Sequence, residues 1–70
     1  MSGAIQIVVN GEKREVPEGL VVVGLLSHLG LPADRVAIER NLEILPRPLW
    51  LDTAVHSGDC FEIVHMVGGG

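Results

Sequence analysis

The dipeptide Asn10-Gly11 is the feature that most narrows the folds open to this chain. It follows residues 5–9, in which apolar side chains alternate with others at the period of a strand with one buried face. It precedes residues 12–16, a charged stretch that Pro17 ends. Asn and Gly both tolerate the positive φ angles that a two-residue turn between antiparallel strands requires. The sequence therefore predicts an N-terminal β-hairpin.

One helix is predicted after the hairpin. Apolar residues recur across residues 22–29 at the spacing of a single helix face, and Gly30 suits a left-handed C-cap. Two features oppose this prediction. Val21 occupies the position where a polar N-cap residue is usual, and Gly24 costs ~1 kcal/mol relative to Ala inside a helix. We therefore expect a helix at residues 22–29 whose first turn is loose.

Two further strands and a short edge segment are predicted beyond the helix. Alternation runs through residues 36–41, the pair Ile44-Leu45 is cut short by Pro46, and alternation resumes through residues 60–67 after a turn at residues 57–59. The last stretch is apolar on both faces, which is typical of a strand at the centre of its sheet. We expect one of these faces to lie at solvent, because a single helix covers only one side of a sheet.

Five bulky side chains are expected to fill the core besides those of the hairpin and the helix. Phe61 and Ile63 face inward from the last strand, while Trp50, Leu51 and Val55 reach the core from a connecting segment with little regular structure. A hairpin, one helix and further strands in so short a chain predict an α+β domain. The expected architecture is a β-grasp fold, a mixed sheet of four to five strands with one helix packed across one face.

The length and composition of the chain exclude several classes of protein. With 70 residues, 47% of them hydrophobic, and a net charge of −4, the chain has the make-up of one small folded domain. Such a domain has little room for a preorganised catalytic pocket, so we expect a protein that is not itself an enzyme. Its five Lys and Arg residues are scattered, which argues against nucleic acid as a partner. No apolar run approaches the ~20 residues of a membrane span, so we expect no membrane association and a cytoplasmic location.

Isolated reactive side chains give little indication of a catalytic or metal site. The single cysteine, Cys60, excludes a disulfide within the chain and a zinc site made of several cysteines, and it fits a reducing compartment. The three histidines lack the spacing of metal ligands, so we expect no metal. Glu39 and Arg40 are expected to form a solvated strand end.

The sequence closes on Gly68, Gly69 and Gly70, and we expect residues 1–67 to form the folded domain and residues 68–70 a flexible reactive tail. A backbone without side chains can pass through a narrow slot. If the chain ends at Gly70, the reactive group of the tail is its terminal carboxylate. This group has an ordinary pKa of ~3.3–3.7 and is a poor electrophile when ionised. It must be activated, most simply as an acyl-adenylate formed with ATP. Taken alone, the tail is also explained as a frayed end or a linker.

The tail does not stand alone, because several segments lead to it in a familiar order and spacing. They are Val9-Asn10-Gly11-Glu12, the helix at residues 22–29 with Gly30-Leu31, Val36-Ala37-Ile38-Glu39-Arg40-Asn41, Ile44-Leu45-Pro46-Arg47 with Trp50, Gly58-Asp59, Glu62-Ile63-Val64-His65 and Val67-Gly68-Gly69-Gly70. On these residues the chain resembles the ubiquitin-like sulfur carriers, and most closely the ThiS family of thiazole and thiamine biosynthesis. The resemblance runs from about Ile5 to Gly70 and departs from the family at Val21, Gly24 and Cys60.

The resemblance implies a chemical role for Gly70. Its carboxylate is expected to be adenylated by an E1-like enzyme of the ThiF type, which uses ATP, and then converted to a thiocarboxylate. The sulfur would come from a cysteine desulfurase or a related donor and pass on to a thiazole synthase of the ThiG type. No stably bound cofactor is expected on the carrier itself.

A docking surface is expected just before the tail. Glu62, Val64 and Met66 lie on the outward face of the last strand, and Val67 follows them. Exposed apolar residues beside a reactive end are typical of a docking patch, and Met suits a carrier that must fit more than one partner. The alternative that loop residues cover Val64 and Met66 stays open at this point.

Three other functions remain open on the sequence. The chain could serve molybdopterin synthesis or another thiocarboxylate pathway on the same fold. It could be a ubiquitin-like modifier whose Gly70 forms an isopeptide bond with a target lysine. It could also be a plain interaction domain with an inert tail.

Overall fold

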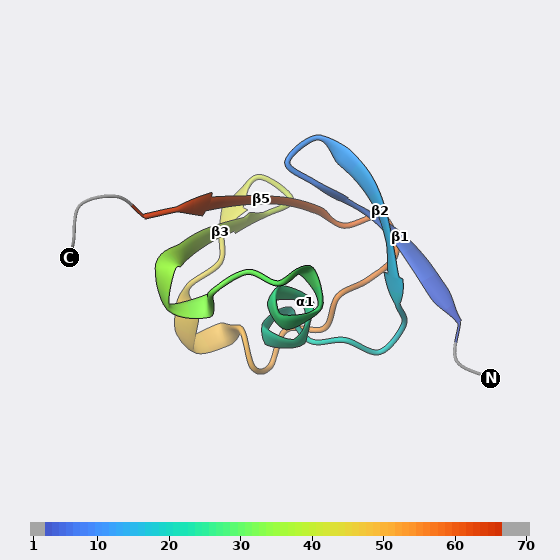
Figure 1. Ribbon diagram of the computed structural model, residues 1–70, viewed down its shortest axis with the longest axis horizontal. Helices are drawn as coiled ribbons and strands as arrows, with labels where there is room; N and C mark the ends of the chain where they lie inside the picture. The colour runs from blue at the N-terminus through green and yellow to red at the C-terminus, as the bar shows by residue number, and fades with distance from the viewer. Residues whose placement is uncertain (1–2, 67–70) are drawn as a thin grey trace.

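Five strands form one mixed sheet, and a single helix packs across one of its faces (Figure 1). The computed structural model describes residues 3–66. The order of strands in the sheet is β2-β1-β5-β3-β4. The elements are β1 (Ala4–Val9), β2 (Glu12–Pro17), α1 (Val22–Leu29), β3 (Val36–Arg40), β4 (Glu43–Ile44) and β5 (Cys60–His65). The predicted α+β fold, with its single helix and its mixed sheet, is confirmed.

The N-terminal hairpin forms as predicted. Val9 pairs with Glu12, which leaves a two-residue turn between β1 and β2. Asn10 and Gly11 adopt φ angles of 51° and 82°, the left-handed values that such a turn requires. β1 also pairs with β5 in parallel, whereas β3 pairs antiparallel with both β4 and β5. β5 is therefore the central strand, as its apolar pattern indicates.

The side chain of Asn10 prolongs the pairing of β1 with β5 beyond the point where β1 turns away. The Asn10 backbone N–H donates to the Phe61 carbonyl at 2.8 Å. Its side-chain Nδ2 then donates to the Ile63 carbonyl at 3.0 Å, and its Oδ1 accepts from the Ile63 N–H at 2.8 Å. The amide thus satisfies the same two backbone groups that another strand residue would pair with.

The first turn of α1 is held by the rest of the chain, so the expectation of a loose first turn is wrong. Val21 makes no side-chain cap. Instead the Val22 N–H donates to the Thr53 carbonyl at 2.9 Å, and the Val23 N–H donates to the Trp50 carbonyl at 3.3 Å. Backbone carbonyls of a distant segment therefore satisfy donors that a polar cap usually satisfies. The other end of the helix stops at Gly30, which takes the predicted left-handed conformation at φ 73°.

The core lies between the sheet and α1, and the predictions for it hold with one exception. Trp50 and Val55 are buried, and so are Phe61 and Ile63. Leu51 is 70% exposed, so its assignment to the core is wrong. Residues 50–52 form a turn, in which successive side chains point in different directions, and Trp50 takes the inward position. The Trp50 indole Nε1 donates to the Leu45 carbonyl at 2.9 Å, and the Arg47 guanidinium lies 4.7 Å from the ring centroid.

Element boundaries differ from the predictions by small amounts. β2 extends one residue further, to Pro17, and β4 begins at Glu43, one residue earlier than the predicted edge segment. β5 ends at His65 rather than at residue 67. Two short 3-10 turns, at Ala33–Arg35 and Arg47–Leu49, were not predicted. None of the helices within residues 3–66 has the length and apolar character needed to cross a bilayer.

Replacing Asn10 tests how much the sheet depends on its amide. Asn10→Gly keeps the left-handed turn but deletes both hydrogen bonds to Ile63, and we expect it to lower the free energy of unfolding by about 2 kcal/mol. Urea denaturation measures this change. Asn10→Asp retains the acceptor for the Ile63 N–H and should lie between the native chain and the glycine variant. A loss below about 0.5 kcal/mol for Asn10→Gly would show that the amide adds little to the pairing.

Candidate functional site

The residues predicted for docking lie at solvent on the face of the sheet opposite α1. Val64 and Met66 are each 55% exposed, and Glu62 is exposed as well. Within residues 3–66, no loop buries them. The remaining predicted site residues, Val67 and the glycines 68–70, lie outside the described residues, as does the boundary expected between domain and tail. We call the surface of the sheet opposite α1 the outer face.

A shallow hollow lies on the outer face where β3, β4 and β5 run side by side. Glu39 is opposite Ile44 on β4 and Glu62 on β5, so all three side chains point to the same side of the sheet. Ala37, opposite Val64, is the small residue beside them, and its size leaves the space open. The hollow is lined by Ala37, Ile38, Glu39, Ile44, Glu62 and Val64.

The β3–β4 turn carries a second exposed apolar group that sequence reasoning missed. Leu42 is 90% exposed and Ile44 is 80% exposed. Asn41 and Leu42 have φ angles of 51° and 72°, so a leucine occupies a left-handed position that favours glycine or asparagine. The sequence signal that could have identified this group is the short connection, residues 41–43, between the apolar residues of the predicted strand and those of the edge segment. The predicted strand end at residue 41 and edge segment at residue 44 did not identify the residue between them as exposed.

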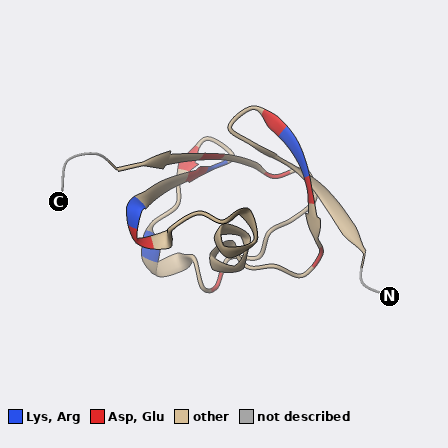
Figure 2. Cartoon of the chain, viewed as in Figure 1, with Lys and Arg blue, Asp and Glu red and all other residues tan. Residues whose placement is uncertain are grey.

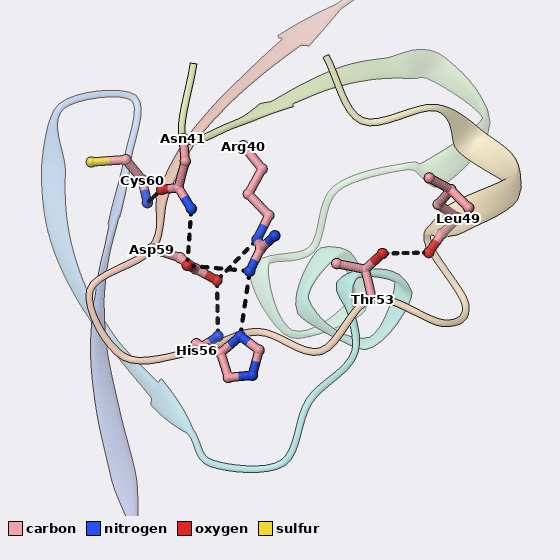
Figure 3. A network of polar contacts seen from close by, with 7 residues as sticks. All are labelled: Arg40, Asn41, Leu49, Thr53, His56, Asp59 and Cys60. Carbon is pink, nitrogen blue, oxygen red and sulfur yellow. Dashed lines mark hydrogen bonds and ion pairs between the residues drawn. The ribbon is translucent and has the colours of Figure 1, made fainter. Parts of the chain in front are cut away.

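The start of β5 is fastened to the end of β3 by a network of polar contacts around Asp59 (Figure 3). Asp59 is 5% exposed. The Arg40 Nε donates to its Oδ2 at 3.1 Å, and the His56 backbone N–H donates to the same oxygen at 2.9 Å. Asn41 Nδ2 donates to Oδ1 at 3.2 Å, while its own Oδ1 accepts from the Cys60 N–H at 2.9 Å. The expectation that Arg40 is a solvated strand end is therefore wrong, because the fold brings a buried carboxylate to it.

The charge of Asp59 is stabilised by this network. Burial alone raises the pKa of Asp59, but hydrogen bonds from His56, Asn41 and Arg40, together with the positive charge of Arg40, outweigh burial and hold the pKa below its ordinary value. Asp59 is thus a structural anion that joins the turn before β5 to β3. It lies at the end of β5 away from the tail.

The described residues offer no assembled metal site. Within residues 3–66, no group of three or more His, Cys, Asp or Glu side chains is placed to hold a metal ion. Cys60 is exposed at the start of β5. Basic residues are divided among β2, β3 and the two 3-10 turns and do not form one patch (Figure 2). The described residues thus present an exposed, partly apolar sheet face, and β5 is the strand that precedes the glycines in the sequence.

Comparison with known proteins identifies the family. The model of the ThiS family matches residues 5–70, which includes the fold, the outer face and the closing glycines. The chain belongs to the ThiS family. The resemblance inferred from the sequence is thereby confirmed.

Solved structures show the same fold at appreciable sequence identity. The crystal structure of the thiamine biosynthesis protein ThiS from Geobacter metallireducens has a TM-score of 0.83 and 38% identity, and the match covers 94% of this chain and 100% of that one. A solution structure of a thiamine biosynthesis protein from the same organism has a TM-score of 0.76 and 36% identity, covering 94% of this chain and 88% of that one. The β-grasp fold is thus shared with members of the family.

Sequence relatives include much longer proteins. A thiazole synthase of Paramagnetospirillum magneticum is 44% identical over 66 residues, which are 94% of this chain and 20% of that protein. A thiazole synthase of Magnetococcus marinus is 35% identical over 66 residues, which are again 94% of this chain and 20% of that protein. This ThiS-family chain therefore spans about a fifth of the length of these relatives. An uncharacterised protein of Porphyra purpurea, ycf40, is 39% identical over 66 residues, and 93% of its length is covered.

The anchoring role of Asp59 predicts a particular dependence of stability on pH. Because its pKa is lowered on folding, Asp59 stabilises the fold above its ordinary pKa, and this contribution disappears as the pH falls through the lower pKa of the folded state. Asp59→Asn should cost about 2 kcal/mol near pH 7, and the difference from the native chain should shrink in acid. Urea denaturation at pH 7 and at pH 3 measures both quantities. The matched control Asp52→Asn changes an exposed carboxylate and should follow the native profile; a constant difference between native and Asp59→Asn would contradict the prediction.

Proposed function

We propose that the chain is a sulfur carrier of thiamine biosynthesis and is not itself an enzyme. The carboxylate of Gly70 is activated and converted to a thiocarboxylate, whose sulfur is then given to a thiazole synthase. The observation that supports this proposal is the family match, which runs from residue 5 to Gly70. The proposal requires Gly70 to be the terminal residue of the chain that reacts.

The chemistry begins with an ionised carboxylate that resists nucleophilic attack. One of its oxygens attacks the α-phosphorus of ATP, pyrophosphate leaves, and an acyl-adenylate forms. Hydrosulfide then adds to the acyl carbon, AMP leaves as the C–O bond breaks, and the thiocarboxylate remains with loss of a proton. If the donor is a persulfide of a cysteine desulfurase, its outer sulfur displaces AMP and an acyl disulfide forms first. A thiol must then cleave the S–S bond, which releases the thiocarboxylate and leaves that thiol in a disulfide with the donor cysteine.

The active sites for these steps are assigned to the partners. An adenylating enzyme of the ThiF type binds ATP, a cysteine desulfurase or related donor supplies sulfur, and a thiazole synthase of the ThiG type accepts it. We assign these reactions to the cytoplasm. The carrier contributes the reactive end and a surface by which it is recognised, with no stably bound cofactor of its own.

A thiazole synthase as the acceptor is supported by the longer relatives. In two proteins named thiazole synthase, a segment similar to 94% of this chain occupies a fifth of the polypeptide. Joining two modules in one chain replaces a bimolecular encounter by an intramolecular one at high effective concentration. Such a fusion is advantageous when the two modules act on each other, which favours thiazole synthesis over another thiocarboxylate pathway.

The outer face near the end of β5 is the proposed docking surface for these partners. Val64 and Met66 expose apolar surface that the helix side of the sheet does not cover, and Glu62 is beside them. Val67 completes the surface assigned from the sequence. A docked partner would hold the domain while the tail enters its active site.

The decisive measurement is the intact mass of the chain after incubation with ATP, the ThiF-type enzyme and a sulfur source. We expect a species heavier by the exchange of one oxygen for sulfur, and fragmentation should place this change at Gly70. An unmodified mass would contradict the proposal. Conjugates linked to lysines of other proteins would instead support a protein modifier.

Shortening the tail separates the reactive end from the fold. Deletion of Gly69 and Gly70 should abolish thiocarboxylate formation, because the shortened backbone no longer brings its carboxylate to the adenylating site. The melting temperature should stay at the native value, since the core formed by the described residues, from Ile7 to Ile63, lies before the tail. A chain with one alanine appended after Gly70 is the matched control for the position of the carboxylate and should be equally inactive. Full activity in either variant would contradict the assignment of the reactive group.

A further inference from the structure

The last residue that the structure describes, Met66, is held by a backbone hydrogen bond just beyond the end of β5. Its N–H donates at 2.8 Å to the carbonyl of Arg35, the last residue of the 3-10 turn Ala33–Arg35. β5 itself ends at His65, which lies opposite Val36 on β3. The bond to Arg35 therefore fixes the backbone at the point from which the chain continues toward the glycines.

This point determines where the reactive group can go. Gly70 is four residues beyond Met66, and four residues of extended backbone span at most roughly 14 Å. In the proposed reaction, a carboxylate oxygen has to come within about 3–3.5 Å of the α-phosphorus of ATP. If the bond at Met66 opens, a partner has to order additional backbone before the reaction, which costs conformational entropy. The position of Met66 therefore bears on the rate at which Gly70 reacts.

The turn that holds Met66 is itself held by the side chain of Arg47. Arg47 begins the second 3-10 turn, which lies beside the first at the end of the sheet toward which β5 runs (Figure 1). Its Nη1 donates to the Ala33 carbonyl, and its Nη2 donates to the Val36 carbonyl at 3.4 Å. These two carbonyls flank Arg35 in the sequence. The guanidinium therefore fixes the backbone on both sides of the residue that bonds to Met66.

The Val36 carbonyl lies beyond the end of the pairing between β3 and β4. Because the Arg35 carbonyl bonds toward β5, the carbonyl of Val36, the next residue, points away from β5. The Ile38 carbonyl points the same way and accepts from the Leu45 N–H at 2.9 Å. The residue after Leu45 is a proline, which has no N–H to donate. The side chain of Arg47 supplies the next donor along this edge of β3.

Arginine suits this place better than another cation. Its guanidinium lies 4.7 Å from the ring centroid of Trp50, which is 3% exposed and is itself fixed by a hydrogen bond from Nε1 to the Leu45 carbonyl. The ion pairs found within residues 3–66 involve Arg14 and Arg40, whereas Arg47 is directed at carbonyls and an aromatic ring. A planar group with several donors can bond two carbonyls while it lies over an indole, and a lysine ammonium cannot do both.

We propose that Arg47 is a positioning residue for the reaction at Gly70. It holds the 3-10 turn at residues 33–35, that turn holds Met66, and Met66 sets the point from which the reactive end of the chain emerges. The inference rests on the proposed function and adds to it a residue that acts from within the fold, without contact with ATP or the carboxylate. Loss of its side chain should leave the outer face unchanged and slow the chemical step.

Single-turnover release of pyrophosphate measures this chemical step. The carrier is mixed with ATP and an excess of the ThiF-type enzyme at increasing concentrations, which gives the maximal rate constant and the half-saturating concentration separately. Arg47→Met keeps a long side chain without donors. It should lower the maximal rate constant at least about fivefold and leave the half-saturating concentration at the native value. Arg47→Lys can reach one carbonyl and should lie between Arg47→Met and the native chain.

Amide hydrogen exchange of the free carrier shows whether Arg47 acts through Met66. We expect the Met66 N–H to exchange at least about tenfold faster in Arg47→Met than in the native chain, because the turn that carries its acceptor has lost its support. The Ile63 N–H, which bonds to Asn10 further back along β5, is the internal reference. Its exchange should accelerate only as far as the loss of global stability, measured by urea denaturation, requires.

Two control variants separate positioning from stability and from charge. Asp59→Asn disrupts the polar network at the other end of β5 and lowers the stability of the fold. Arg14→Met removes the charge of an exposed arginine on β2. Both variants should keep the native maximal rate constant. An equal fall in Asp59→Asn would show that the rate follows stability and would overturn the positioning role.

The remaining outcomes distinguish this inference from the carrier function on which it rests. A native maximal rate constant in Arg47→Met would overturn the positioning role, while the observed reaction upholds the carrier function. A lower rate constant with native exchange at Met66 would also overturn it, because Arg47 would then act by contact with the enzyme. If Arg47→Met does not fold, Arg47→Lys is judged by the same two measurements. If the native chain releases no pyrophosphate, the carrier function fails and the positioning role falls with it.

Discussion

The parallel pairing of β1 with β5 is the interaction on which the rest of the structure depends, because it joins the first strand of the chain to the last. Only two residue pairs, Val8 with Cys60 and Val9 with Phe61, form this pairing. The amide of Asn10 adds a third contact by bonding to both backbone groups of Ile63. Once β5 is held in this way, β3 and β4 can add to its other side, and the sheet becomes wide enough to cover α1.

The same central position explains why the outer face is available to partners. A strand paired on both sides is normally apolar on both faces because both are covered. Here α1 covers one face, and Val64 on the other is half exposed. The facing carboxylates of Glu39 and Glu62 beside it and Leu42 in the neighbouring left-handed turn are costly for an isolated domain. Backbone strain and exposed apolar side chains are typical of surfaces at which a protein binds another molecule.

Features set by local chemistry could be predicted from the sequence, and features set by distant contacts could not. The turn at Asn10-Gly11 and the helix end at Gly30 follow from backbone preferences of those residues. The start of α1 is stabilised by a hydrogen bond to the Thr53 carbonyl, about thirty residues away. The residues around Val21 therefore give no local signal of this cap. Arg40 meets Asp59 only after β3 and β5 have paired. Among the exposed residues of the outer face and its turn, Val64 and Met66 could be predicted from the alternation of inward and outward side chains along the last strand. The exposure of Leu42 could not be predicted in this way, because it depends on the left-handed turn between β3 and β4.

The topology also has a mechanical consequence for a domain that is held by its last strand. β5 lies inside the sheet, with β1 running parallel on one side and β3 antiparallel on the other. Hydrogen bonds between strands lie across the strand direction, so tension applied along β5 loads many of them together. An edge strand is paired on one side only, so the same pull would meet fewer hydrogen bonds. A partner that draws the tail into a narrow channel therefore pulls on the strand of this sheet that is hardest to extract, and the domain can resist that pull while remaining folded.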